Sequence, residues 1–161
     1  MKHVVVLLGA LLIAAPAFSQ EENLLSFELT EKPAQLLQRL GHPSLIVPGG
    51  ELESWQYQIG IEDNHEFSHI LLFRKATGEL LSLTRNWEHE RNVDEWFPPA
   101  ETKVYYYSDA TNPAYGVRVR RLSGGRVLMA MGSATPGQLA GQVVLIRETE
   151  LHTFHPWLKL D

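Results

Sequence analysis

Histidines and carboxylates are the residues of this sequence whose types and spacing suit metal binding. His65 and His69 are separated by three residues, and His89 follows in a charged segment. The acidic residues near them in the sequence are Glu62, Asp63, Glu66, Glu88 and Glu90. Zinc sites combine histidines with a carboxylate, but the His-Glu-x-x-His motif is missing here. A periplasmic metal-dependent enzyme that uses His65, His69 and, as a third ligand, His89 is therefore an alternative hypothesis, and we assign no metal ligand.

Motifs for other kinds of catalysis are absent. The sequence has no Gly-x-Ser-x-Gly motif, and the run Ser123-Gly124-Gly125 is typical of a hairpin turn and not of a phosphate-binding loop. Asp94 and Glu95 are adjacent carboxylates in a polar segment, which favours a solvated loop. We therefore expect no catalytic residue and no cofactor.

Aromatic residues gather in one segment and suggest a binding surface. Trp87, Trp96 and Phe97 lie within residues 87–100, and Tyr105 and Tyr107 follow. Long loops in small domains are often functional, and Trp and Tyr are frequent anchors of protein interfaces. We take these five as candidate binding residues. The other interpretation is that they fill the core at the junction between two halves of the domain.

Four arginines fall on one predicted hairpin: Arg118, Arg120, Arg121 and Arg126. They form a local basic cluster that an acidic partner or ligand could contact. Cross-strand acidic neighbours on a solvated strand face are the favoured alternative.

Hydrophobic periodicity predicts one helix and a series of short strands. Thr30 as N-cap, Pro33 in the first turn and Gly41 as C-cap delimit a helix that ends near Leu40. The predicted strands cover residues 25–29, 55–59, 67–74 and 80–85, then 102–108, 115–122, 126–131 and 143–147. Residues 67–74 are apolar on both faces, which predicts a central strand. Residues 87–100 are interpreted as a long loop.

The N-terminus has the pattern of a secretory signal peptide. Lys2 precedes an apolar run over residues 4–15 that is too short to span a bilayer, and small residues follow it. We expect residues 1–19 to be removed and residues 20–161 to form one domain, with halves at about 20–86 and 101–161. The predicted location is the periplasm or the medium.

Composition narrows the classes of partner. The chain contains no cysteine, which excludes disulfides, thiolate metal sites and a lipid anchor on cysteine. Its formal net charge of −5 argues against nucleic acid as a partner. No apolar stretch after the signal peptide reaches membrane length, so we expect no membrane span.

One stretch of the sequence resembles a known group of small exported bacterial proteins. The residues concerned are Leu40-Gly41-His42-Pro43, then, after a loop, Trp55-Gln56-Tyr57. This pattern resembles that of the BamE-like outer-membrane assembly lipoproteins and of the β-lactamase inhibitory protein repeat. The match covers about residues 30–86, and it implies a helix pair on a short antiparallel meander, protein–protein binding and no catalysis. The lipoprotein cysteine and the inhibitor disulfides are missing here.

These observations predict an α+β fold in which one or two short helices pack on an antiparallel β-meander sheet, with two meander halves in one compact unit. The leading functional hypothesis is an exported, non-catalytic module that binds an envelope or extracellular protein. The predicted contact surface is the segment around Trp87, Trp96 and Phe97 together with the adjacent sheet face.

Overall fold

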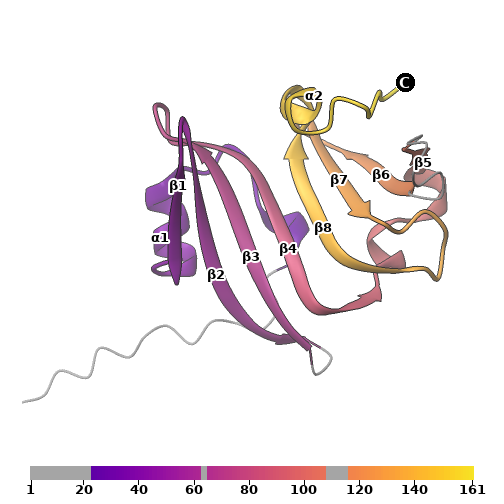
Figure 1. Cartoon of the computed structure of the whole chain (residues 1–161), viewed down its shortest axis with the longest axis horizontal. Coiled ribbons are helices and arrows are strands. Elements are labelled where there is room, and N and C mark those ends of the chain that lie inside the picture. The colour runs from indigo at the N-terminus through magenta and orange to yellow at the C-terminus, as the bar shows by residue number, and fades with distance from the viewer. Residues whose placement is uncertain (1–22, 63–64, 108–115) are drawn as a thin grey trace, which may run out of the picture.

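Eight strands and two short helices make up the computed structural model, which describes residues 23–62, 65–107 and 116–161 (Figure 1). The strands are β1 (Leu45–Gly49), β2 (Leu52–Glu62), β3 (His65–Arg74), β4 (Glu79–Asn92), β5 (Thr102–Tyr106), β6 (Gly116–Leu122), β7 (Arg126–Met131) and β8 (Leu139–Arg147). The helices are α1 (Pro33–Leu40) and α2 (Leu151–Phe154), and the 3-10 turns are η1 (Leu24–Ser26), η2 (Asp94–Trp96), η3 (Pro99–Glu101) and η4 (Glu148–Glu150). The predicted signal peptide, residues 1–19, lies outside the described residues.

The helix α1 forms where the sequence predicts one, but it starts later. Lys32, and not Thr30, is the N-cap residue, because the Lys32 N–H donates to Gln35 Oε1 at 2.7 Å. Gly41 ends the helix with a φ of 77°, a conformation that glycine adopts without strain. Within the described part of the chain, no helix is long and apolar enough to cross a membrane.

All eight strands belong to one open antiparallel sheet in the order β1-β2-β3-β4-β8-β7-β6-β5. Each half is a meander of consecutive strands, and the two halves join where β4 pairs with β8. This arrangement confirms the predicted fold class, with the sheet as the main component and the helices as minor ones.

Two local predictions are confirmed by the strand pairing. The doubly apolar segment 67–74 lies within β3, which pairs with β2 on one side and β4 on the other. The turn between β6 and β7 contains Gly124 and Gly125 with φ values of 73° and 66°. Two consecutive positive φ angles define the tight hairpin turn that this glycine pair favours.

The prediction of a loop at residues 87–100 is wrong for residues 87–92, which belong to a strand. The strand β4 continues through residues 87–92 and pairs again with β8, with Arg91 opposite Ala140 and Asn92 opposite Leu139. Charge in this segment is compatible with a strand because Glu88, His89 and Glu90 are exposed. The segment then forms the short turns η2 and η3.

The strand predicted at residues 25–29 is also wrong. Asn23 accepts a hydrogen bond from the Leu25 N–H through its side-chain oxygen at 2.9 Å, and this starts the turn η1. Asparagine favours such local bonds over strand pairing. Phe27 and Leu29 are still buried, as the apolar pattern predicts, but they pack on the sheet instead of joining it.

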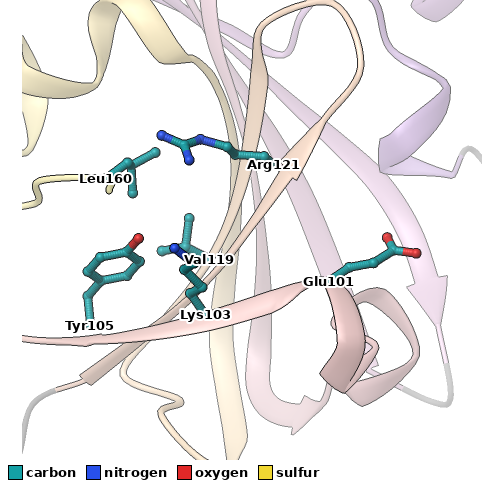
Figure 2. Close-up of a pocket in the computed structure, with 6 residues that line it drawn as sticks. All are labelled: Glu101, Lys103, Tyr105, Val119, Arg121 and Leu160. Carbon is teal, nitrogen blue, oxygen red and sulfur yellow. The ribbon is translucent and has the colours of Figure 1, made fainter.

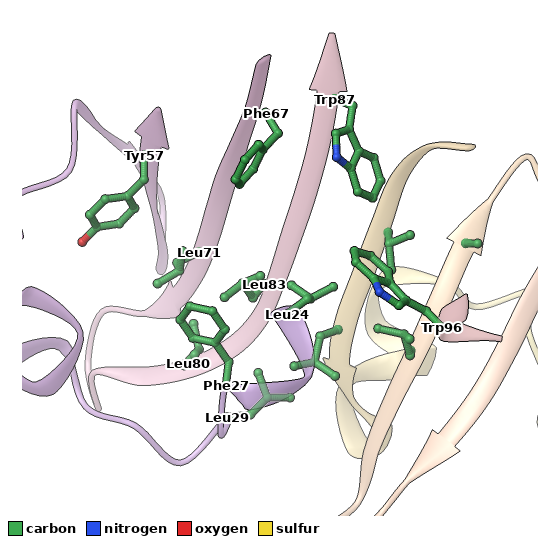
Figure 3. Packing of buried hydrophobic residues seen from close by; sticks show 14 of the residues in the cluster. Leu24, Phe27, Leu29, Tyr57, Phe67, Leu71, Leu80, Leu83, Trp87 and Trp96 are labelled. Atoms are coloured by element: carbon green, nitrogen blue, oxygen red, sulfur yellow. The ribbon is translucent and has the colours of Figure 1, made fainter. Parts of the chain in front are cut away.

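The two faces of the sheet have different coverings. On the face that we call the helix face, η1 and α1 pack on Tyr57, Leu71 and Leu83 (Figure 3). On the opposite face, which we call the tail face, α2 and the residues after it pack on Met129 and Val144. Figure 1 places α1 against the β1–β4 half of the sheet and α2 against the β8–β5 half. Among the described residues, no helix covers the tail face of the first half.

A buried glycine at the start of β6 allows close packing and gives a first prediction. A Cβ atom on Gly116 would clash with the Ala134 Cβ and lie 3.2 Å from Cε1 of Tyr106. We expect Gly116→Ala to lower the free energy of unfolding by about 1–3 kcal/mol through overpacking. Gly141→Ala is the matched control, because its nearest neighbour, Glu90 Cγ, is at 3.7 Å. Urea denaturation should separate the two variants, and equal stabilities would contradict the packing argument.

Candidate functional site

The uncovered part of the tail face is an open surface of the sheet, and strand register determines its residues. Paired residues on neighbouring strands share a face, as do alternate residues along a strand. Leu45 pairs with Gln56, Gln56 with Ile70, Ile70 with Thr84 and Thr84 with Val144. Three rows of this kind make up what we call the open face: Leu45, Gln56, Ile70 and Thr84; Val47, Ser54, Leu72 and Ser82; Gln58, Ser68 and Asn86.

The open face contains no charged residue. Its side chains are aliphatic, hydroxyl or amide groups, and most of them are partly exposed. Charged residues lie instead beyond the first and the last of these rows. Arg74 forms ion pairs with Glu79 at 3.6 Å and Glu150 at 3.1 Å at one end, and Glu66 and Glu88 lie at the other. An uncharged centre with a charged rim is the usual arrangement of a protein interface.

A hollow of about 210 Å³ lies at the acidic end of the open face. Gln58, Ser68 and Asn86 from the last row line it together with Glu66 and Glu88. Gln58 Nε2 donates to Glu66 Oε2 at 3.4 Å, a long bond that holds one carboxylate at the rim. The hollow offers carboxylate and amide acceptors, which suit a cationic side chain from outside.

The edge strand β1 extends the open face with exposed apolar side chains. Leu45 and Val47, which belong to the open face, are 50% and 41% exposed, and Ile46, which pairs with Trp55 and so lies on the helix face, is 48% exposed. Three such residues in a row are more typical of a buried strand. Natural edge strands are usually short or interrupted by proline, which limits pairing with other chains. Pro48 interrupts β1 in this way. The backbone of this strand is therefore partly blocked from pairing, while its side chains are available for contact.

Three of the five predicted binding residues are buried in the core. Trp87, Trp96 and Phe97 are only 6%, 8% and 3% exposed, and Figure 3 shows the two tryptophans within the helix-face cluster. Their ring centroids lie 5.6 Å apart. These three residues fill the core, as the alternative interpretation predicts. The prediction that they form an exposed aromatic surface is wrong.

The two tyrosines lie elsewhere, on the tail face at the far edge of the sheet. Tyr105 on β5 pairs with Val117 and packs at the margin of the tail-face core. Tyr107 follows β5 and contacts Trp157 edge-on, with ring centroids 5.2 Å apart. The structure therefore separates the five predicted residues into a core group of three and an edge group of two.

His69 is a core residue. It has no exposed surface, and its Nε2 accepts a hydrogen bond from Arg85 Nε at 2.9 Å. Its ring lies 5.7 Å from Phe27 and 5.8 Å from Phe67 between centroids. Burial first, then the positive charges of Arg85 and Arg39, lower the pKa of His69 to about 3. The same guanidinium groups would repel a metal ion, so His69 is unsuited as a ligand.

Of the other two histidines of the metal hypothesis, the structure describes the side chain of His89. His65 begins β3, and its side chain lies outside the described residues. His89 is exposed on β4. Across residues 23–62, 65–107 and 116–161, no three His, Asp or Glu side chains are grouped as metal ligands would be.

The four arginines of the hairpin are all matched by carboxylates: Arg118 by Asp94, Arg120 by Glu101 at 2.7 Å, Arg121 by Glu148 at 3.0 Å and Arg126 by Glu28 at 3.2 Å. Arg118 is buried, and its hydrogen bond to Asp94 is the main cause of a lowered pKa for that carboxyl. Carboxylate partners are thus present, but none of them is the cross-strand neighbour that the favoured alternative expects. The expected solvation is also wrong for Arg118 and Arg126, which are buried.

The sequence analysis did not identify the open face. Its rows can be assigned only once strand register is known, because a shift of one residue moves every side chain to the other face. One signal was present: Ser54, Gln56 and Gln58 alternate with large aromatic residues along one strand. That alternation marks an uncharged outer face opposite a buried one.

Comparison with known proteins adds no further assignment. No protein-family model, curated protein or solved structure matches this chain. The resemblance of residues 30–86 to BamE-like and inhibitory-protein repeats therefore stays a prediction.

Proposed function

We propose that this chain is a non-catalytic module that acts outside the cytoplasm and binds an envelope or extracellular protein through the open face. The observation that carries the proposal is the absence of charge across three rows of the sheet, between charged rims. The signal-like N-terminus supports the location, and His69, a ligand of the alternative metal hypothesis, is buried against Arg85.

The chemistry of the open face restricts the partner. A charge buried without a counter-charge at an interface costs several kcal/mol, so the centre of the partner surface should also be uncharged. The acidic hollow beside Glu66 and Glu88 suits a lysine or arginine at the edge of that surface. The partner that fits is therefore a protein with an aliphatic and polar, uncharged patch next to one basic residue.

The size of the open face indicates a weak complex. Four strands about 4.8 Å apart and three rows about 6.8 Å apart cover roughly 400 Å². Stable complexes bury about 800 Å² per partner, and smaller interfaces belong to transient encounters. We therefore expect an affinity in the micromolar range.

The proposal can be tested by site-specific crosslinking. A photo-crosslinking residue at Thr84, in the middle row of the open face, should capture one dominant protein in the native host. The same residue at Thr153, which is exposed on α2, is the matched control. Capture of one protein from Thr84 alone identifies the partner, whereas identical capture from both positions would contradict the assignment of the surface.

Charge insertion then measures the contact directly with the purified partner. Thr84→Glu should weaken binding at least tenfold, because it buries an unpaired charge within the interface. Thr153→Glu makes the same chemical change outside the open face and should alter the dissociation constant less than twofold. Circular dichroism melting checks that both variants are folded. Unchanged binding by folded Thr84→Glu would overturn the proposal.

A further inference from the structure

A second pocket lies on the tail face at the other end of the sheet, between the edge strands and the C-terminal tail (Figure 2). It has a volume of about 80 Å³ and is lined by Glu101, Lys103, Tyr105, Val119, Arg121 and Leu160. Figure 2 shows the ends of Lys103, Tyr105, Arg121 and Leu160 around a common space, with the Glu101 carboxylate turned away. This pocket is separate from the open face, and a ligand bound in it would be independent of the proposed function.

One cation in this pocket is left without a counter-charge. Arg121 donates to Glu148 at 3.0 Å and to the backbone oxygen of Asp161 at 2.6 Å, so its charge is largely matched. Glu101 is paired with Arg120. Within the described parts of the chain, the Lys103 ammonium and the Tyr105 hydroxyl have no side-chain partner. They are two donors on one side of the pocket.

The other side of the pocket is apolar. Val119 is buried on the floor, with 3% of its surface exposed, and Leu160 of the tail packs against the same core. Sites for drug-sized ligands measure about 300–1,000 Å³, so this pocket can accept only a very small molecule. A single unmatched cation favours an anion with one negative charge over a dianion such as hydrogen phosphate.

We propose that this pocket binds a small monocarboxylate with a short apolar group. The carboxylate accepts hydrogen bonds from Lys103 Nζ and Tyr105 Oη, and the apolar group contacts Val119 and Leu160. Charge-assisted bonds to a carboxylate are the stronger class of hydrogen bond. Because the ligand has few atoms and the pocket is open to solvent, we expect a dissociation constant on the order of 1 mM.

Sodium butyrate is a suitable probe, titrated at constant ionic strength into the ¹⁵N-labelled protein. We expect saturable NMR shifts at the amides of Lys103, Tyr105 and Val119. Butyramide, which has the same shape without the charge, should bind at least tenfold more weakly. Shifts that do not saturate, or that spread over charged residues of the whole surface, would overturn the proposal.

Two variants make the test specific. Lys103→Met should weaken butyrate binding at least tenfold, and Tyr105→Phe should weaken it several-fold while keeping the ring. Lys159→Met removes the same charge from an exposed position beside Leu160 and should change binding less than twofold. Inorganic phosphate provides a further arm: tighter binding of phosphate than of butyrate would overturn the monocarboxylate assignment, as would butyrate binding by Lys103→Met equal to that of the wild type.

Discussion

Acidification should destabilise the protein between pH 6.5 and pH 4.5 by roughly 2–3 kcal/mol through His69 alone. The pKa of His69 is lowered from 6.5 to about 3 in the folded chain by burial and by the charges of Arg85 and Arg39. Below pH 6.5 the unfolded chain therefore binds a proton that the folded chain does not. Stability that is present above pH 6.5 is lost progressively as the pH falls toward 3.

His69→Gln isolates this contribution, since the glutamine carbonyl can still accept the hydrogen bond from Arg85. Urea denaturation at several pH values should show a flatter profile for His69→Gln than for the wild type. The half-buried His155, whose pKa is also lowered by burial, contributes in the same direction, so the comparison is best made in a His155→Gln background. His152→Gln, at an exposed position, is the control. Equal slopes for His69→Gln and the wild type would rule out His69 as the source.

Truncation of Trp96 should cost about 3–5 kcal/mol of unfolding free energy, the usual range for a large aromatic residue in a core. Trp96 is 8% exposed, its ring lies against Trp87, and the Arg85 guanidinium lies 5.4 Å from its centroid. Trp96→Ala therefore leaves a cavity and also removes the aromatic face beside a buried cation. Chemical denaturation followed by far-UV circular dichroism measures the loss.

Leu139→Ala is the matched control for Trp96→Ala, because Leu139 is 46% exposed and its truncation should cost less than about 1 kcal/mol. A Trp96→Ala variant as stable as Leu139→Ala would show that the ring is not part of the core. The expected instability also bears on binding experiments. A partner lost together with Trp96 would report unfolding and not the loss of a direct contact.

Local sequence signals predicted those parts of the fold in which neighbouring residues decide the structure. Pro33 and Gly41 delimit α1, two apolar faces place β3 inside the sheet, and Gly124 with Gly125 forms the β6–β7 turn. Each of these depends on a few adjacent residues. The continuation of β4 beyond residue 86 was not predicted, because it requires pairing with β8, which is distant in the sequence.

The candidate site was less predictable than the fold for a related reason. Aromatic residues at 87–97 gave the strongest signal in the sequence, but tryptophan serves equally as core and as interface anchor. Burial of Trp96 depends on β4 and η2 coming together over the helix face, which no local pattern reports. The open face, in contrast, consists of serine, threonine, glutamine and asparagine with a few aliphatic residues. A single residue of these types in a sequence does not indicate a binding site.

The pairing of β4 with β8 also has a consequence for how the chain reaches its native state. Seven strand pairs hold the sheet, and six of them join strands that are consecutive in the sequence, whereas β4 and β8 bring Ser82 to Ile146. Closing that large loop carries the greatest entropic cost, so the two meanders should form first and dock late. Until they dock, the 14-residue strand β4 is the bare edge of the N-terminal meander. We therefore expect this undocked intermediate to be more prone to aggregation than the finished sheet.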